Sequence, residues 1–168
     1  MKSLLPILFL LSSSLCISQN AASWLNAKFK NADSILFVSH DDTQGVAIID
    51  SAGNKIPLPE LIINKNPNYK IIKERQIISG QQLDTLIHIL DRPFRSKTVE
   101  GSECYMPHHT IYIFKNGELS YIDLCFWCRG FETSEDLNKI YKFDNRKWKE
   151  LENFFKRLGF KYKLTSFE

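Results

Sequence analysis

Three of the four cysteines and two adjacent histidines are the residues of this sequence whose types and spacing best suit chemistry. Cys104 and His108-His109 precede a pair of apolar runs, and Cys125 and Cys128 follow it in a Cys-x-x-Cys segment. Thiolates can act as nucleophiles and redox groups, and together with imidazoles they bind metal ions, whereas cysteines in an oxidising compartment form disulfides. The elements between the two groups decide whether these side chains meet.

A β-hairpin is predicted between the two groups. The runs 110–114 and 119–124 are joined by Lys115-Asn116-Gly117-Glu118, and Asn-Gly between apolar runs is typical of a two-residue hairpin turn. This register places Ile111 opposite Ile122 and His109 opposite Leu124 on an aliphatic face, which we expect to be core.

The same register gathers chemical side chains at the open end of the hairpin. His108 falls opposite Cys125, and Cys104 falls near Cys128, so that both cysteine groups and one of the two histidines meet. A bulge near Pro107 would change which histidine faces the cysteines.

A disulfide is the first of three chemistries that this cluster could support, and the one we favour. Cys104 with Cys128 is the simplest pair, and Cys125 is the other candidate partner. Cross-strand neighbours meet the Cα separation that a disulfide requires. Closing the loop of roughly 25 residues between Cys104 and Cys128 would stabilise the fold by about 3 kcal/mol in the chain-entropy model.

The other two chemistries are metal binding and thiol–disulfide exchange. Cys104, Cys125 and Cys128 with one histidine supply the four ligands of a tetrahedral zinc site. Exchange at Cys125 and Cys128 needs a lowered thiol pKa, usually from a helix N-terminus. Because Arg129-Gly130-Phe131 does not begin a convincing helix, thioredoxin-like chemistry is disfavoured.

The segments Cys104-Tyr105-Met106-Pro107-His108-His109 and Leu124-Cys125-Phe126-Trp127-Cys128 resemble a pattern in uncharacterised secreted proteins of the Bacteroidota. That pattern is Cys-x-x-Pro-Arg-His followed by Ile-Cys-Phe-x-Cys, so His108 stands in place of Arg and Leu124 in place of Ile. The resemblance implies no activity. It favours His109 as the histidine that belongs with the cysteines, which makes the candidate zinc set Cys104, His109, Cys125 and Cys128.

The elements along the chain predict an α+β fold, an antiparallel sheet with helices packed on one face, in a single domain over residues 19–168. Helices are expected over residues 22–32, from Ser79 (capped with Gln82) to before Pro93, and over 145–158 between the caps Asp144 and Gly159. Further strands are expected over 34–39 and 46–50, which form a hairpin, over 71–78 at a sheet edge, and over 160–165. Residues 51–69 are expected to form a long loop.

Residues 1–18 are predicted to be a signal peptide. Lys2 precedes the apolar run 4–11, and Cys16-Ile17-Ser18 suits cleavage before Gln19. Lipidation of Cys16 is the alternative, disfavoured because Leu15 stands where a small residue is expected. The protein is therefore expected to be secreted or periplasmic, where disulfides persist.

Charge and motifs narrow the function without naming it. The formal net charge of +3, or one less without Lys2, favours no nucleic-acid partner. No later apolar run is long enough for a transmembrane helix, and no Gly-x-Ser-x-Gly, His-Glu-x-x-His or phosphate-loop motif occurs. His40-Asp41-Asp42 is interpreted as a polar turn. Whether the chain is an enzyme stays open. We favour a non-enzymatic binding or envelope-associated domain with no cofactor, whose partner could be an envelope protein. Zinc binding is the alternative, and thiol oxidoreductase activity is a weaker one.

Overall fold

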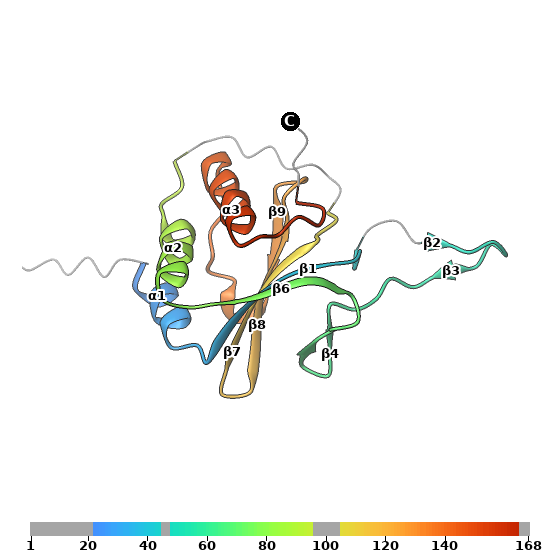
Figure 1. The fold of residues 1–168 in the computed structure, drawn as a ribbon, viewed down its shortest axis with the longest axis horizontal. Helices are drawn as coiled ribbons and strands as arrows, with labels where there is room; N and C mark the ends of the chain where they lie inside the picture. Colours follow the sequence, from blue (N-terminus) through green and yellow to red (C-terminus); the bar gives the residue numbers. More distant parts are fainter. Residues whose placement is uncertain (1–21, 45–47, 96–104, 165–168) are drawn as a thin grey trace, which may run out of the picture.

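The computed structural model describes residues 22–44, 48–95 and 105–164, and its centre is a five-stranded antiparallel sheet (Figure 1). The strand order is β6-β1-β7-β8-β9. These strands are β6 (Ile72–Ile78), β1 (Ser34–His40), β7 (His109–Lys115), β8 (Glu118–Cys125) and β9 (Gly130–Thr133). The predicted α+β class with an antiparallel sheet is confirmed.

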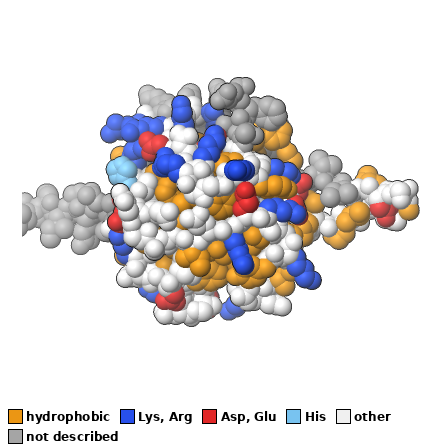
Figure 2. Space-filling model, in the orientation of Figure 1, with side chains coloured by type: hydrophobic (Ala, Val, Ile, Leu, Met, Phe, Trp, Pro, Cys, Tyr) orange, Lys and Arg blue, Asp and Glu red, His pale blue; other side chains and the backbone are white. Residues whose placement is uncertain are grey.

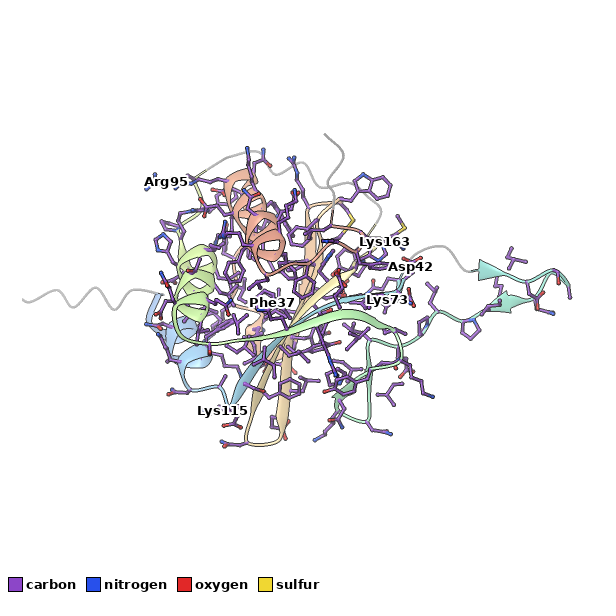
Figure 3. All side chains as sticks on the ribbon, in the orientation of Figure 1. Phe37, Asp42, Lys73, Arg95, Lys115 and Lys163 are labelled. Atoms are coloured by element: carbon purple, nitrogen blue, oxygen red, sulfur yellow. A yellow bond between two sulfur atoms is a disulfide. The ribbon has the colours of Figure 1, made fainter. Side chains whose placement is uncertain are left out.

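Three α-helices share one hydrophobic core with one face of the sheet (Figure 1). They are α1 (Ala22–Lys30), α2 (Gly80–Asp91) and α3 (Asn145–Arg157), and a short 3-10 helix, η1 (Glu135–Leu137), follows β9. Phe37 of β1 lies at the centre of this core, where its ring packs 4.8 Å from that of Phe155 in α3 (Figure 3). The opposite face carries a smaller cluster, in which Tyr112 donates a hydrogen bond to the carbonyl of Leu61.

The predicted β7–β8 hairpin is confirmed together with its register. Lys115 pairs with Glu118, Ile111 with Ile122 and His109 with Leu124. The turn residues Asn116 and Gly117 have φ values of 50° and 79°, the positive angles that such a turn requires. The local turn chemistry therefore sets the alignment of both strands.

The expected hairpin between residues 34–39 and 46–50 is wrong. β1 is a central strand that pairs with β6 on one side and β7 on the other. It is buried along almost its whole length, and its continuous apolar run is typical of a strand covered on both faces rather than of half a hairpin. β6 lies at the sheet edge, as its charged centre predicted.

The segment expected to be a long loop contains two short ladders. β2 (Ile48–Ile49) pairs with β3 (Lys55–Ile56), and β4 (Ile62–Ile63) pairs with β5 (Asn66–Pro67). The β2–β3 ladder projects away from the sheet as an arm (Figure 1) and carries exposed hydrophobic side chains (Figure 2). These strands are too short for sequence periodicity to reveal them.

The helix ends test the predicted caps. Asp144 accepts a hydrogen bond from the backbone N–H of Lys147 at the start of α3, and Gly159 after its end has a φ of 93°, so both caps are confirmed. The capping box of Ser79 and Gln82 is wrong, because Ser79 makes no side-chain cap. Residues 160–164 form no strand.

Residues 1–18, predicted to be a signal peptide that includes Cys16, lie outside the described residues, as do Cys104 and residue 165. Within the described part of the chain, none of the helices is long and apolar enough to cross a membrane.

Candidate functional site

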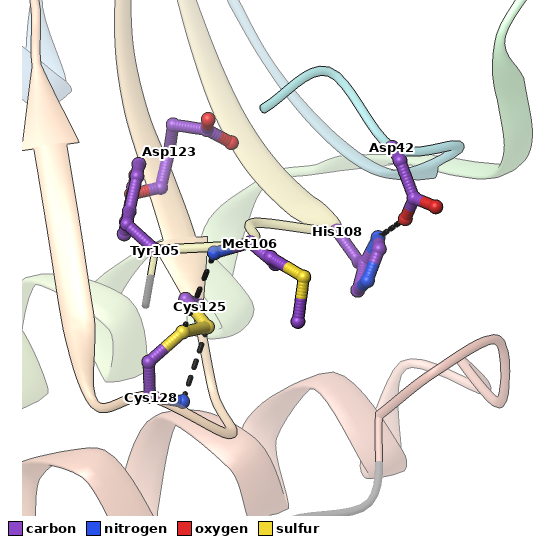
Figure 4. Close-up of a disulfide and its surroundings, with 7 residues drawn as sticks. All are labelled: Asp42, Tyr105, Met106, His108, Asp123, Cys125 and Cys128. Carbon is purple, nitrogen blue, oxygen red and sulfur yellow. Dashed lines mark hydrogen bonds and ion pairs between the residues drawn. A yellow bond between two sulfur atoms is a disulfide. The ribbon is translucent and has the colours of Figure 1, made fainter. Parts of the chain in front are cut away.

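The Cys-x-x-Cys segment forms the turn between β8 and β9. Cys125 is the last residue of β8 and pairs with Gly130, the first of β9, while Arg129 has a φ of 51° between them. This tight turn brings Cys125 and Cys128 together in a disulfide with a Cα–Cα separation of 5.4 Å (Figure 4). Cys128 is therefore paired with Cys125 and not with Cys104, the partner expected first.

The disulfide is enclosed by the chain around it. Cys125 and Cys128 are 1% and 2% exposed. The backbone N–H of Cys128 lies 3.1 Å from the Cys125 sulfur, and that of Met106 lies 3.5 Å from the Cys128 sulfur. The segment before β7 is thus fastened to the disulfide turn, and the sulfurs are shielded from an attacking thiolate.

Among the described residues, the surroundings of the two sulfurs lack the features that activate a redox cysteine. A low thiol pKa usually comes from a helix N-terminus or a neighbouring cation. Here the segment joins two strands, and the adjacent cation Arg129 donates instead to the Asn145 side chain, 2.9 Å away. The geometry is that of a structural disulfide that closes the turn between β8 and β9.

His109 belongs to the hydrophobic core. Its ring packs edge-to-face against Phe126 and Phe155, with centroids 5.0 and 5.3 Å away. Burial, reinforced by repulsion from His40 and His108, lowers its pKa to about 3. Its Nε2 is buried without a hydrogen-bond partner among the described residues. The imidazole is therefore neutral near pH 7, and it lies on the aliphatic face that the register predicted.

The zinc set is only partly described. Cys104 lies outside the described residues, and Cys125 and Cys128 are joined to each other, so in this form they are not the thiolates that zinc binds. Among residues 22–44, 48–95 and 105–164, no three His, Cys, Asp or Glu side chains are grouped to hold a metal ion.

His40 is a buried polar residue at the end of β1 rather than part of an exposed turn. Its Nδ1 lies 2.7 Å from the carbonyl oxygen of Asp41, and its Nε2 lies 3.3 Å from Oδ1 of Asp123. Thr110 donates a hydrogen bond to the same carboxylate oxygen at 2.8 Å. Both ring nitrogens of His40 therefore face oxygen atoms, and the ring is held in place from both sides.

Asp41 and Asp42 connect this end of β1 to distant segments. Figure 3 shows Asp42, Lys73 and Lys163 gathered there. Lys73 lies 2.7 Å from Asp41 and holds the pKa of that carboxyl below its usual range. Asp42 lies 2.8 Å from Lys163 and 3.2 Å from Nδ1 of His108 (Figure 4). Burial lowers the pKa of His108. Asp41 and Asp42 thus form ion pairs with lysines from distant segments, which adjacent sequence does not reveal.

A groove of about 740 Å³ lies on a different part of the molecule, between α1, the end of α2 and the segment before α3. Its lining consists of residues 24–25, His88, residues 90–94, residues 139–142 and Lys147. The volume falls in the range of small-molecule sites, about 300–1,000 Å³. Both aromatic and cationic side chains line it.

Two cations in the groove wall are largely removed from water. The side chain of Arg92 is 9% exposed, and its Nη1 binds Glu150 while its Nη2 is buried without a hydrogen-bond partner among the described residues. Lys147 is 3% exposed and donates to the carbonyl of Leu90 at 2.7 Å, and burial lowers the pKa of its ammonium.

The sequence interpretation missed this groove, although it contained one usable signal. Lys147 falls in phase with Leu151 and Phe154 on the buried stripe of α3, where a charged residue needs a reason. The other lining segments are far apart in the sequence and carry no common motif.

Comparison with protein-family models, curated proteins and solved structures finds no match. The fold and the site therefore define this chain as a single α+β domain with a disulfide-fastened β-turn and a separate cationic groove. The resemblance to secreted proteins of the Bacteroidota stays a prediction.

Proposed function

We propose that this protein is an exported, non-enzymatic binding domain whose ligand occupies the groove between α1, α2 and residues 139–142. The observation that carries the proposal is the separation of the reactive residue types from the groove. The disulfide, His109 and the His40–Asp123 pair are each buried, and none of them lines the groove. The volume that suits a small molecule is lined by other residues.

The contacts around the disulfide, at the open end of the β7–β8 hairpin, serve to hold the fold together. The disulfide closes the β8–β9 turn, Met106 bonds to one sulfur, and Tyr105 donates to the carbonyl of Asp123 at 3.0 Å (Figure 4). These contacts link the segment before β7 to β8 and to the β8–β9 turn. A disulfide in this role persists in the periplasm or outside the cell, which agrees with the signal peptide expected over residues 1–18.

Zinc binding and thiol exchange are the alternatives, and both require the disulfide to be reduced. Zinc titration of the reduced protein, followed by elemental analysis, tests the first. Insulin reduction tests the second. We expect neither stoichiometric zinc nor reduction above the background rate, because burial disfavours a thiolate at Cys125 and the described residues around it supply no activating group.

The binding proposal is tested with a small-molecule extract of the periplasm of an expressing bacterium. ¹⁵N-labelled protein is added to the extract, backbone resonances are followed by NMR, and the extract is analysed by mass spectrometry before and afterwards. We expect resonances of groove residues to shift and no extract component to be consumed. Consumption of a component that stops on Cys125→Ser or His108→Gln substitution would identify an enzyme and overturn the proposal.

A further inference from the structure

We propose that the groove binds a small organic anion, whose carboxylate or phosphate contacts Arg92 and whose apolar part packs against aromatic side chains of the lining. This inference rests on the proposed function and names the ligand class. It depends on the charge of the lining, on an unused donor in the wall and on the aromatic residues at the mouth.

Cationic side chains outnumber carboxylates in the lining of the groove. Arg92, Lys139, Lys142 and Lys147 line the groove, while Asp91 is its only carboxylate among the described residues. Within the same described residues, Lys139 and Lys142 form no ion pair. Cations that line a concave surface raise the local concentration of anions, because the low-dielectric walls focus the field.

A guanidinium nitrogen of Arg92 without a hydrogen-bond partner among the described residues is a second argument for an anion, separate from the charge of the lining. Its guanidinium is largely buried, and Nη1 binds Glu150. The other terminal nitrogen, Nη2, is buried without an acceptor among the described residues. A buried donor without a partner costs free energy, and a charged acceptor removes that cost. Since Arg92 lines the groove and its Nη2 is enclosed, a turn of the guanidinium toward the groove would let a carboxylate or phosphate there supply the acceptor, and the planar group suits both anions.

Lys147 adds a second cation beneath the groove. Its ammonium is buried, lies 5.1 Å from the centre of the Phe143 ring and uses one donor on the Leu90 carbonyl. An ammonium has three donors, so a further acceptor can be served without breaking that bond. Both cations have a carboxylate nearby, Asp144 for Lys147 and Glu150 for Arg92, so the unpartnered Nη2 is what makes Arg92 the principal anion ligand.

The apolar part of the ligand has a matching surface. The rings of Phe94 and Tyr141 meet edge-to-face with centroids 5.9 Å apart, and Tyr141 is 70% exposed. Trp24 and Leu25 line the groove from α1. Exposed aromatic side chains beside cations suit a ligand that combines an anionic head with an apolar body.

The test compares anions with neutral molecules of the same shape. Benzoate and phenyl phosphate are titrated into the ¹⁵N-labelled full chain, with benzamide as the neutral match of benzoate. We expect both anions to shift resonances of groove residues and to bind at least tenfold more tightly than benzamide, because a bond to a charged group contributes that much.

Arg92→Gln and Arg146→Gln form a matched pair of variants. Both arginines bind Glu150, but Arg146 is 60% exposed and lies outside the groove lining, and each variant leaves Glu150 with the other arginine. We expect the Kd for benzoate to rise at least tenfold in Arg92→Gln and to change less than twofold in Arg146→Gln.

The outcomes separate this inference from the proposed function. If benzamide binds the groove as tightly as benzoate, the groove is a binding site but the anion assignment is overturned. If neither anion shifts the groove resonances, or if both variants weaken binding equally, the anion assignment is also overturned. The proposed function fails separately, through consumption of an extract component.

Discussion

Replacing His109 by Leu should remove the part of the loss of stability in acid that comes from the burial of this histidine. The ordinary pKa of histidine is about 6.5, and burial against Phe126 and Phe155 lowers that of His109 to about 3. Below pH 6.5 the unfolded chain binds a proton that the folded protein excludes. The free energy of unfolding therefore falls as the pH falls, until the pH approaches 3.

The magnitude follows from the two pKa values. Each pH unit between them contributes about 1.4 kcal/mol. Going from pH 7 to pH 4, His109 alone should lower the free energy of unfolding by about 3 kcal/mol. Carboxyl groups whose pKa is lowered in the folded protein, such as Asp136 with a pKa of about 2, also lower the free energy of unfolding as the pH falls. Since the variant retains them, their contribution cancels in the comparison.

The assay is urea unfolding of the wild type and of His109→Leu at pH 7, 5.5 and 4, with His88→Gln as a control on the exposed side of α2. Leu is close to His in volume and removes the unpartnered Nε2, so the variant should fold. The wild type and His88→Gln should lose about 3 kcal/mol more than His109→Leu between pH 7 and pH 4. Equal losses in all three proteins would refute the burial of a neutral His109.

Three further predictions follow from the described contacts. Cys125→Ser combined with Cys128→Ser should lower the free energy of unfolding by about 2 kcal/mol with the fold retained, because the disulfide closes a very short loop; circular dichroism and urea unfolding test this, and a variant that fails to fold would contradict it. Asp123→Ala should cost about 3 kcal/mol, since it leaves the Nε2 of His40 and the hydroxyl of Thr110 buried without their acceptor, whereas Asp42→Ala, at a side chain that is 44% exposed, should cost less than about 1 kcal/mol; similar melting temperatures for the two variants would argue against the buried pair. Gly117→Ala should cost about 1 kcal/mol, because φ is 79° at this turn, and an unchanged melting temperature would exclude that turn conformation.

Local chemistry made the β7–β8 hairpin predictable from the sequence. Asn116-Gly117 determines the turn, the turn determines the register, and the register places His109 opposite Leu124 in the core. The caps of α3 were predictable for the same reason, because Asp144 and Gly159 act on backbone groups only a few residues away.

Contacts between distant segments were harder to predict. A hairpin of residues 34–39 and 46–50 was expected because the two runs are adjacent in the sequence. Instead, β1 pairs with β6 and β7, because a strand that is buried on both faces is most stable at the centre of the sheet. The expected Cys104–Cys128 bridge followed from cross-strand proximity, whereas the conformation of the turn at Arg129 pairs Cys128 with Cys125. Strand pairing and disulfide pairing of this kind depend on tertiary packing, which cannot be read from a single sequence.

The groove was not predictable because its parts act only when assembled. Trp24, Arg92, Tyr141 and Lys147 come from separate segments, and each has an ordinary reason to occur where it does. Lys147 on the buried stripe of α3 was the exception, and a search for charged residues in phase with apolar ones would have identified it.

Thiol trapping of the folded protein tests most directly whether the Cys125–Cys128 disulfide is structural rather than an active centre. The protein is incubated with reduced glutathione at a series of urea concentrations below the unfolding transition, quenched with N-ethylmaleimide and mapped by peptide mass spectrometry. Because both sulfurs are buried, we expect labelling of Cys125 and Cys128 to be slow without urea and to accelerate with urea in step with the population of unfolded protein. Rapid reduction that does not depend on urea would show sulfurs accessible in the fold and contradict the structural assignment.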